Sequence, residues 1–144
     1  MRVKELNNKV AHVVWSPLTV CPWSYIAAGT ASEQLDASFS TKSHLELLKL
    51  DVTNPSGDLE VSGAVESPSR FAKLIWSDYD ALGAKHIIIG GCEDSKIYLH
   101  DYEKILANGR SVVQVLDKHG PGPVSALDVN PFQKNLLASG KYNL

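Results

Sequence analysis

The 144-residue sequence predicts an all-β fold in which one strand pattern is repeated along the chain. An apolar strand that stops at a turn signal, followed by a second apolar strand that stops at glycine, occurs three times. Runs that alternate apolar and polar residues follow the first two occurrences. Hydrophobic residues make up 44% of the chain and charged residues 21%, which suits a packed core and excludes general disorder.

The first strand of each repeat ends at an equivalent position, marked by Trp15, Trp76 and Val129. A turn signal follows each of them, and the second strand of each repeat then runs to a glycine. These second strands are predicted at residues 25–29, 86–91 and 135–140. The anchors lie further apart than one propeller repeat of roughly 40–45 residues, so we expect insertions in the connecting loops.

Third strands are predicted at residues 44–51 and 96–101, and fourth strands at about 59–65 and 111–116. Four short antiparallel strands per unit, repeated radially, form the blade of a β-propeller. We therefore expect residues 1–144 to form a partial propeller of about two and a half blades. The expected limits are 9–66 for blade one with an insertion at 30–41, 70–117 for blade two and 118–144 for an incomplete blade three.

Charge and cysteine content exclude several classes of partner. Fourteen Lys and Arg against 16 Asp and Glu give a net charge of −2, so the chain has no overall basic character for nucleic acid. The two cysteines, Cys21 and Cys92, are too far apart for a paired-cysteine zinc motif, and they fit a reducing, cytoplasmic compartment. Proline and polar residues interrupt the uncharged stretch 11–32, which predicts two strands and a turn and no direct membrane insertion.

No arrangement of residues predicts an enzyme. The five histidines lack metal-ligand spacing, and no phosphate-binding loop or nucleophile elbow is present, so we expect no catalytic, cofactor-binding or metal-binding residues. A loop with Asp36, Ser38 and Ser40 offers hydroxyls and a carboxylate but no histidine to act as a general base. Trp15 and Trp76 are interpreted as core aromatics, with a ligand platform as the alternative.

Residues 91–101 resemble the passage from the second to the third strand of a WD repeat, with His100 and Asp101 in place of the Trp-Asp pair. Asp94 occupies the turn, where its carboxylate can accept hydrogen bonds from nearby backbone amides. His119 is placed like the histidine that precedes the first strand in such repeats, and Ser139 lies on the following second strand. The resemblance implies that Asp94, Asp101, His119 and Ser139 belong to a WD-type hydrogen-bond network.

Several segments further resemble the amino-terminal propeller of the Sec31-type family, the large subunit of the outer COPII vesicle coat. These segments are residues 11–17, 29–41, 45–47, 73–76, 117–119 and 126–133. The insertion that ends in Phe39, Ser40 and Thr41 is the most specific of them, because ordinary WD repeats lack it.

The resemblance implies a non-catalytic scaffold that acts through propeller contacts in endoplasmic reticulum to Golgi vesicle transport. Its location would be the cytoplasm, COPII-coated vesicles and the cytosolic side of the endoplasmic reticulum membrane, and its partners would be other COPII coat subunits. The family regions that bind the small WD-repeat partner and the inner coat are expected to lie outside this chain. Residues 2–6 are expected to be an outer strand of the propeller's last blade, unpaired or loosely docked here. The alternative function is a generic WD-repeat adaptor that binds peptide or protein ligands.

Overall fold

A computed structural model describes residues 10–19, 24–31, 42–51, 53–54, 57–80 and 83–143. Three sequence predictions lie outside these residues: the strand at 2–6, nearly all of the insertion at 30–41 with its Asp36 and Ser38, and the surroundings of Cys21. The described part contains ten strands and one short helix.

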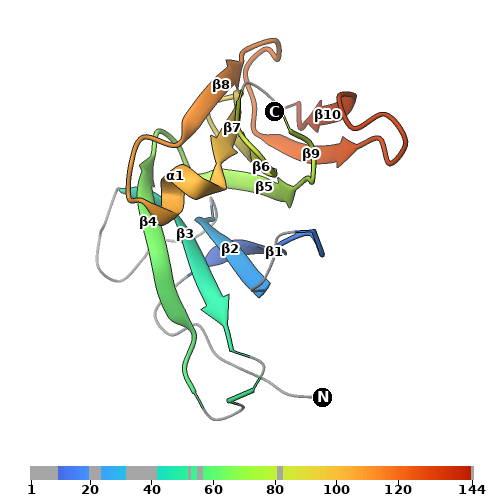
Figure 1. Cartoon of the computed structure of the whole chain (residues 1–144). Coiled ribbons are helices and arrows are strands. Elements are labelled where there is room, and N and C mark those ends of the chain that lie inside the picture. The colour runs from blue at the N-terminus through green and yellow to red at the C-terminus, as the bar shows by residue number, and fades with distance from the viewer. Residues whose placement is uncertain are drawn as a thin grey trace.

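The strands form three antiparallel sheets, two of four strands and one of two (Figure 1). The first sheet has the order β1 (Ala11–Trp15), β2 (Ser24–Thr30), β3 (Ser43–Leu50), β4 (Glu60–Ser67). The second has the order β5 (Phe71–Trp76), β6 (Ile87–Cys92), β7 (Ile97–Asp101), β8 (Val112–Leu116). The third pairs β9 (Val124–Val129) with β10 (Leu137–Lys141). The predicted all-β, partial propeller fold is confirmed.

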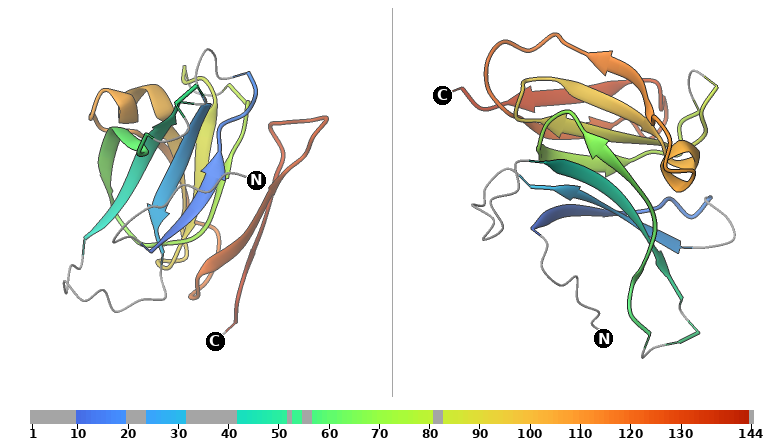
Figure 2. Two further views of the ribbon diagram at one scale, coloured as in Figure 1. Left: turned by 90° about the horizontal axis from the view of Figure 1, so that it is seen from below. Right: turned by 90° about the vertical axis from the view of Figure 1, so that its left-hand side faces the viewer.

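The first strands of the three sheets are neighbours, because β5 contacts both β1 and β9. The sheets fan out from these inner strands, with β4 and β8 at the outer edges (Figure 2). Trp15, Trp76 and Val129 are the last residues of β1, β5 and β9, as the repeat pattern predicted. The uncharged stretch 11–32 supplies β1 and β2, and none of the described helices is long and apolar enough to cross a membrane.

The core between the first two sheets is built around Phe71, which is fully buried at the start of β5. A Cβ atom on Gly29 would lie 2.5 Å from the Phe71 ring, and a Cβ atom on Gly90 would lie 2.3 Å from it. The ring therefore fits between two strands only because both carry glycine there. This contact explains the glycine found near the end of the second strand in both repeats.

The short helix α1 (Tyr102–Leu106) between β7 and β8 was not predicted. Its N-cap is Asp101, whose carboxylate accepts a hydrogen bond from the Glu103 amide at 3.0 Å. At the other end, Asn108 has a φ of 53°, and the amides of Asn108 and Gly109 donate back to carbonyls of the last turn. This is a Schellman motif with asparagine in the left-handed position.

Helix α1 holds the second sheet against the first. A Cβ atom on Gly63 of β4 would lie 2.3 Å from the Ile105 carbonyl oxygen, so the helix backbone packs directly on that glycine. Ile105 is fully buried in the same core cluster as Phe71. The Asn108 side-chain oxygen accepts a hydrogen bond from the Ala64 amide at 3.0 Å. These contacts set the position of β8 relative to β4.

Candidate interaction surface

The carboxyl ends of the three inner strands meet at a cleft of about 370 Å³. All three sheets supply its walls, which are lined by Trp15, Pro17, Ile75, Trp76, Ser77, Asp78, Asp128, Val129, Pro131 and Lys134. The turns that follow the inner strands therefore lie on one face of the molecule. The three anchor positions identified in the sequence all line this cleft.

The two tryptophans differ in burial, so the assignment of Trp15 to the core is wrong. Trp76 is only 8% exposed, donates a hydrogen bond from Nε1 to the His86 carbonyl oxygen at 3.1 Å and packs against the Tyr102 ring. Trp15 is 58% exposed. The physical reason is that β5 lies between β1 and β9, whereas the described residues place a sheet on only one side of β1.

A charged pair crosses the cleft between the second and third sheets. Lys134, in the turn between β9 and β10, donates a hydrogen bond to the Asp78 carboxylate after β5. The Lys134 ammonium group lowers the pKa of Asp78, so this carboxylate stays ionised. The cleft thus combines an exposed aromatic ring with a fixed ion pair, a combination that suits recognition of another protein.

Asp94 occupies the tight turn between β6 and β7, where it accepts hydrogen bonds from the Lys96 amide at 3.2 Å and the Tyr98 hydroxyl at 2.5 Å. Tyr98 is buried, and this burial together with the Asp94 contact raises the pKa of its hydroxyl. Among the described residues, Asp94 therefore accepts a hydrogen bond from a tyrosine hydroxyl as well as from a backbone amide, and the sequence had suggested only the amide.

The other residues assigned to the WD-type network lie in two places. Asp101 caps helix α1. His119 and Ser139 belong to the third repeat, where His119 Nε2 lies 2.8 Å from the Ser139 hydroxyl oxygen. The structure thus brings His119 and Ser139 together, whereas Asp94 and Asp101 lie at opposite ends of β7.

Sequence reasoning missed a buried polar pair at the end of β7. His100 is fully buried, its Nδ1 lies 2.9 Å from the Ser111 hydroxyl oxygen, and its Nε2 has no hydrogen-bond partner in the described part of the chain. Burial lowers the pKa of His100 to about 4, so the ring is neutral at physiological pH. Its position in place of the WD tryptophan is the signal that could have identified it.

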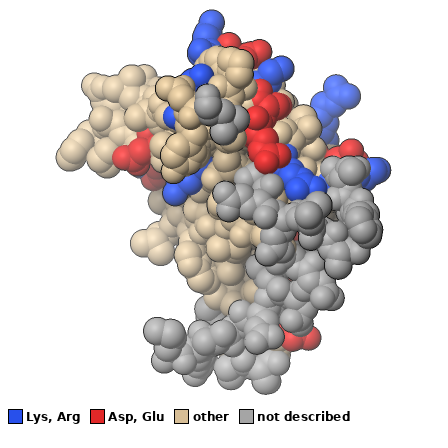
Figure 3. Space-filling model, turned by 180° about the vertical axis from the view of Figure 1, so that it is seen from behind, with Lys and Arg blue, Asp and Glu red and all other residues tan. Residues whose placement is uncertain are grey.

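Metal ligation, thiol reactivity and surface charge bear on the chemistry open to the described residues. They contain no cluster of three or more His, Cys, Asp or Glu side chains that could hold a metal ion. Burial and the nearby carboxylates of Asp94 and Glu93 raise the pKa of the Cys92 thiol, which disfavours the reactive thiolate. Figure 3 shows positive and negative side chains interspersed on one face of the molecule.

Curated relatives match nearly the whole chain. The chain is 43% identical over 143 residues to human protein transport protein Sec31A and 44% identical over 144 residues to the mouse protein, covering 97% of this chain in each case. It is 34% identical over 149 residues to protein transport protein SEC31 of Dictyostelium discoideum. The chain is a Sec31-type sequence. It spans about an eighth of the length of these relatives, and no protein-family model matches it.

Chains in solved structures of the COPII coat share the fold of this chain. A chain in the COPII outer coat vertex on membranes matches 93% of this chain with a TM-score of 0.72 and 28% identity. A chain in the COPII coat assembled on membranes matches with the same TM-score and identity. This chain covers 32% and 18% of those two chains, respectively.

Proposed function

We propose that this Sec31-type chain is a non-catalytic structural element of the outer COPII coat in endoplasmic reticulum to Golgi transport. The observation that carries the proposal is the similarity to Sec31 proteins over 97% of the chain, together with the match to an outer coat vertex structure. Residues 9–66, 70–117 and 118–144 are assigned as successive blades. The chain acts on the cytosolic side of the membrane with other coat subunits as its partners.

We further assign the cleft at the ends of the inner strands as the surface that contacts another coat subunit. Trp15 is exposed at its edge, and tryptophans are enriched among residues that dominate binding energy. The Asp78–Lys134 pair fixes the opposite wall and adds polar contacts at the rim. Three sheets converge here, so one partner can engage all three.

A chimera tests both parts of the proposal. The chain replaces the matching segment of human Sec31A, and coat assembly on liposomes is followed by sedimentation and electron microscopy. We expect the chimera to assemble. We expect Trp15→Ala to reduce assembly about tenfold or more at a fixed subunit concentration, as loss of an aromatic residue that dominates binding energy does.

Tyr142→Ala is the matched control, since Tyr142 is also an exposed aromatic residue but does not line the cleft. It should leave assembly unchanged. Failure of a folded chimera to assemble would contradict the coat role. Normal assembly of the Trp15→Ala chimera would contradict only the assignment of the cleft.

A further inference from the structure

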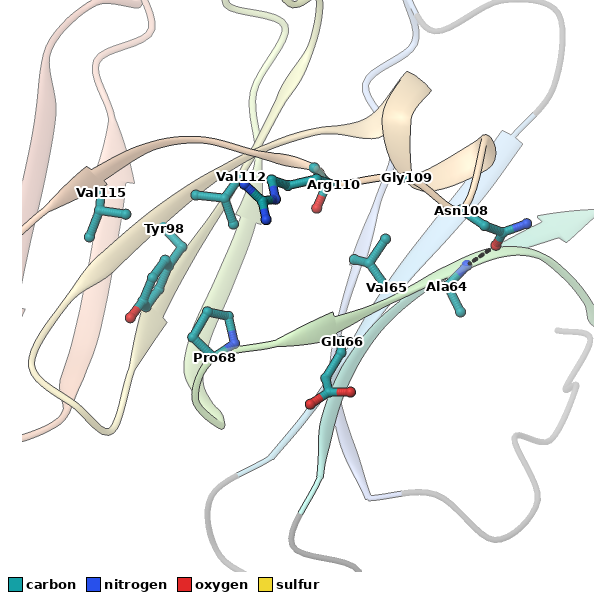
Figure 4. Close-up of a pocket in the computed structure, with 11 residues that line it drawn as sticks. Ala64, Val65, Glu66, Pro68, Tyr98, Asn108, Gly109, Arg110, Val112 and Val115 are labelled. Carbon is teal, nitrogen blue, oxygen red and sulfur yellow. Dashed lines mark hydrogen bonds between the residues drawn. The ribbon is translucent and has the colours of Figure 1, made fainter.

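A second groove, remote from the cleft, lies at the outer edge of the molecule between β4 and β8. It has a volume of about 620 Å³ and is drawn in Figure 4. One wall comes from β4 and the residues that follow it, with Val65, Glu66 and Pro68. Val112 and Val115 of β8 and the buried Tyr98 supply apolar surface on the other side.

The groove exposes an edge of β4 that pairs with no other described strand. In an antiparallel pair, residues whose backbone groups face away from the partner strand recur at every second position. Ala64 is such a residue, because its amide donates to Asn108 Oδ1 on the side away from β3. Glu66 lies two positions further along β4 and is opposite His44 of β3. The backbone amide and carbonyl of His44 both hydrogen-bond the Thr30 hydroxyl on β2, so they point away from Glu66.

The Glu66 amide and carbonyl therefore face the groove. Asn108 occupies the position of a fifth strand beside Ala64 by accepting a hydrogen bond from its amide. No described strand pairs with the next position along this edge, at Glu66. An unpaired strand edge is a template for an added strand, in which backbone hydrogen bonds provide affinity and side-chain pockets provide selectivity.

The charges of the groove favour an acidic ligand. The Glu66 carboxylate is already paired with Lys42, with 3.6 Å between Nζ and Oε2. Arg110 has no ion-pair partner among the described residues. Its side chain lies beside Val112, next to the apolar wall (Figure 4). A carboxylate that entered the groove would find a guanidinium available for a charge-assisted hydrogen bond.

We propose that this groove binds an extended peptide segment that adds a strand to the edge of β4, with aliphatic side chains against Val65 and Val112 and a carboxylate on Arg110. The partner is thus a linear segment of alternating apolar and acidic residues. This inference is independent of the coat proposal, since it uses neither Trp15 nor the cleft.

The probe is a synthetic peptide of sequence Ser-Val-Glu-Val-Glu-Val-Ser, acetylated and amidated at its ends, titrated into the ¹⁵N-labelled 144-residue chain. We expect saturable shifts of the Glu66 amide signal and of signals from β8. A version N-methylated at alternate residues should lose this binding, because it cannot donate the backbone hydrogen bonds of an added strand.

Charge reversal tests the role of Arg110. Arg110→Glu should weaken binding of the glutamate peptide about tenfold and should favour a peptide with lysine in place of glutamate. Lys118→Glu makes the same charge change at an exposed residue outside the groove and should have little effect.

Any of three results would overturn the proposal. One is the absence of saturable shifts at Glu66 with the glutamate peptide. Another is equal weakening by Arg110→Glu and Lys118→Glu, which would show that only the net charge of the chain matters. Binding of the N-methylated peptide as tightly as the parent would contradict strand addition.

Discussion

At the scale of single residues, His100 is the most consequential polar side chain in the core. Its ring is enclosed by Phe71 and Tyr98, and Ser111 is the hydrogen-bond partner of Nδ1. A neutral imidazole fits this site, whereas an imidazolium would place a charge at Nε2, which none of the described residues hydrogen-bonds. The residue therefore couples the stability of the second sheet to pH.

We expect the free energy of unfolding to fall as the pH falls from about 6.5 to about 4. An unfolded histidine takes up a proton near pH 6.5, whereas folded His100 stays neutral until about pH 4. The loss should reach about 2 kcal/mol at pH 5. Urea unfolding at pH 7 and pH 5, monitored by tryptophan fluorescence, measures it.

His100→Asn keeps a polar atom near Ser111 and removes the titrating group, so it should flatten this pH dependence. His119→Asn removes a histidine that is half-buried and hydrogen-bonded to Ser139, and it should leave the pH dependence in place. Equal pH dependence in the wild type and in His100→Asn would contradict the assignment.

The two tryptophans show what a sequence pattern determines about a residue. The repeat correctly predicted that Trp15 and Trp76 end equivalent strands. It could not predict that Trp76 would be enclosed and Trp15 exposed, because burial depends on which sheets pack on each side of a strand. Likewise, the pairing of Asp78 with Lys134 joins residues from different repeats, which no local motif reveals.

At the scale of elements, the strands were predictable and the helix was not. Period-two alternation and the terminal glycines place β3, β6 and β7 close to their observed limits. Helix α1 has only five residues and one buried side chain, Ile105, so it carries no helical periodicity. Its signals are the Asp101 cap and the Asn108 turn, which are also typical of plain loops.

The packing of α1 on β4 makes a prediction about Gly63. Gly63→Ala should lower the free energy of unfolding by about 1–3 kcal/mol, because the new methyl group would meet the Ile105 carbonyl oxygen at 2.3 Å and backbone cannot move aside as a side chain can. Chemical denaturation of the variant and the wild type measures the change.

Gly109→Ala is the matched control, since a Cβ atom there has an ordinary contact of 3.6 Å with the Lys104 carbonyl oxygen. It should change stability by well under the effect at Gly63. Similar losses for the two variants would mean that close packing of the helix on β4 does not limit stability.

At the scale of the whole molecule, the second sheet is the central structural unit. One core cluster, which includes Phe71 and Leu45, joins it to the first sheet, and another, which includes Ile87 and Val124, joins it to the third. The fan of sheets was predictable from the repeat because each unit must bury its faces on its neighbours. The cleft at the inner strands and the groove between β4 and β8 were not predictable, since they depend on α1 and on side chains from several units.

The three sheets should differ in local stability. β5 to β8 form a four-stranded sheet with neighbours on both sides, whereas β9 and β10 pair only with each other among the described strands. A two-stranded unit is marginal in water and depends on its packing against a larger sheet. We therefore expect the amides of β9 and β10 to exchange with solvent faster than those of β6 and β7, as measured by hydrogen exchange and mass spectrometry.

Val124→Ala provides the decisive variant, because Val124 is fully buried between the second and third sheets. It should raise exchange in β9 and β10 by about tenfold or more and leave β2 and β3 nearly unchanged, since the lost packing lies only at the second junction. Equal protection of all three sheets in the wild type, or a uniform rise across the chain in the variant, would show that the molecule opens as one cooperative unit. In that case β9 and β10 would belong to the same folding unit as the first two sheets.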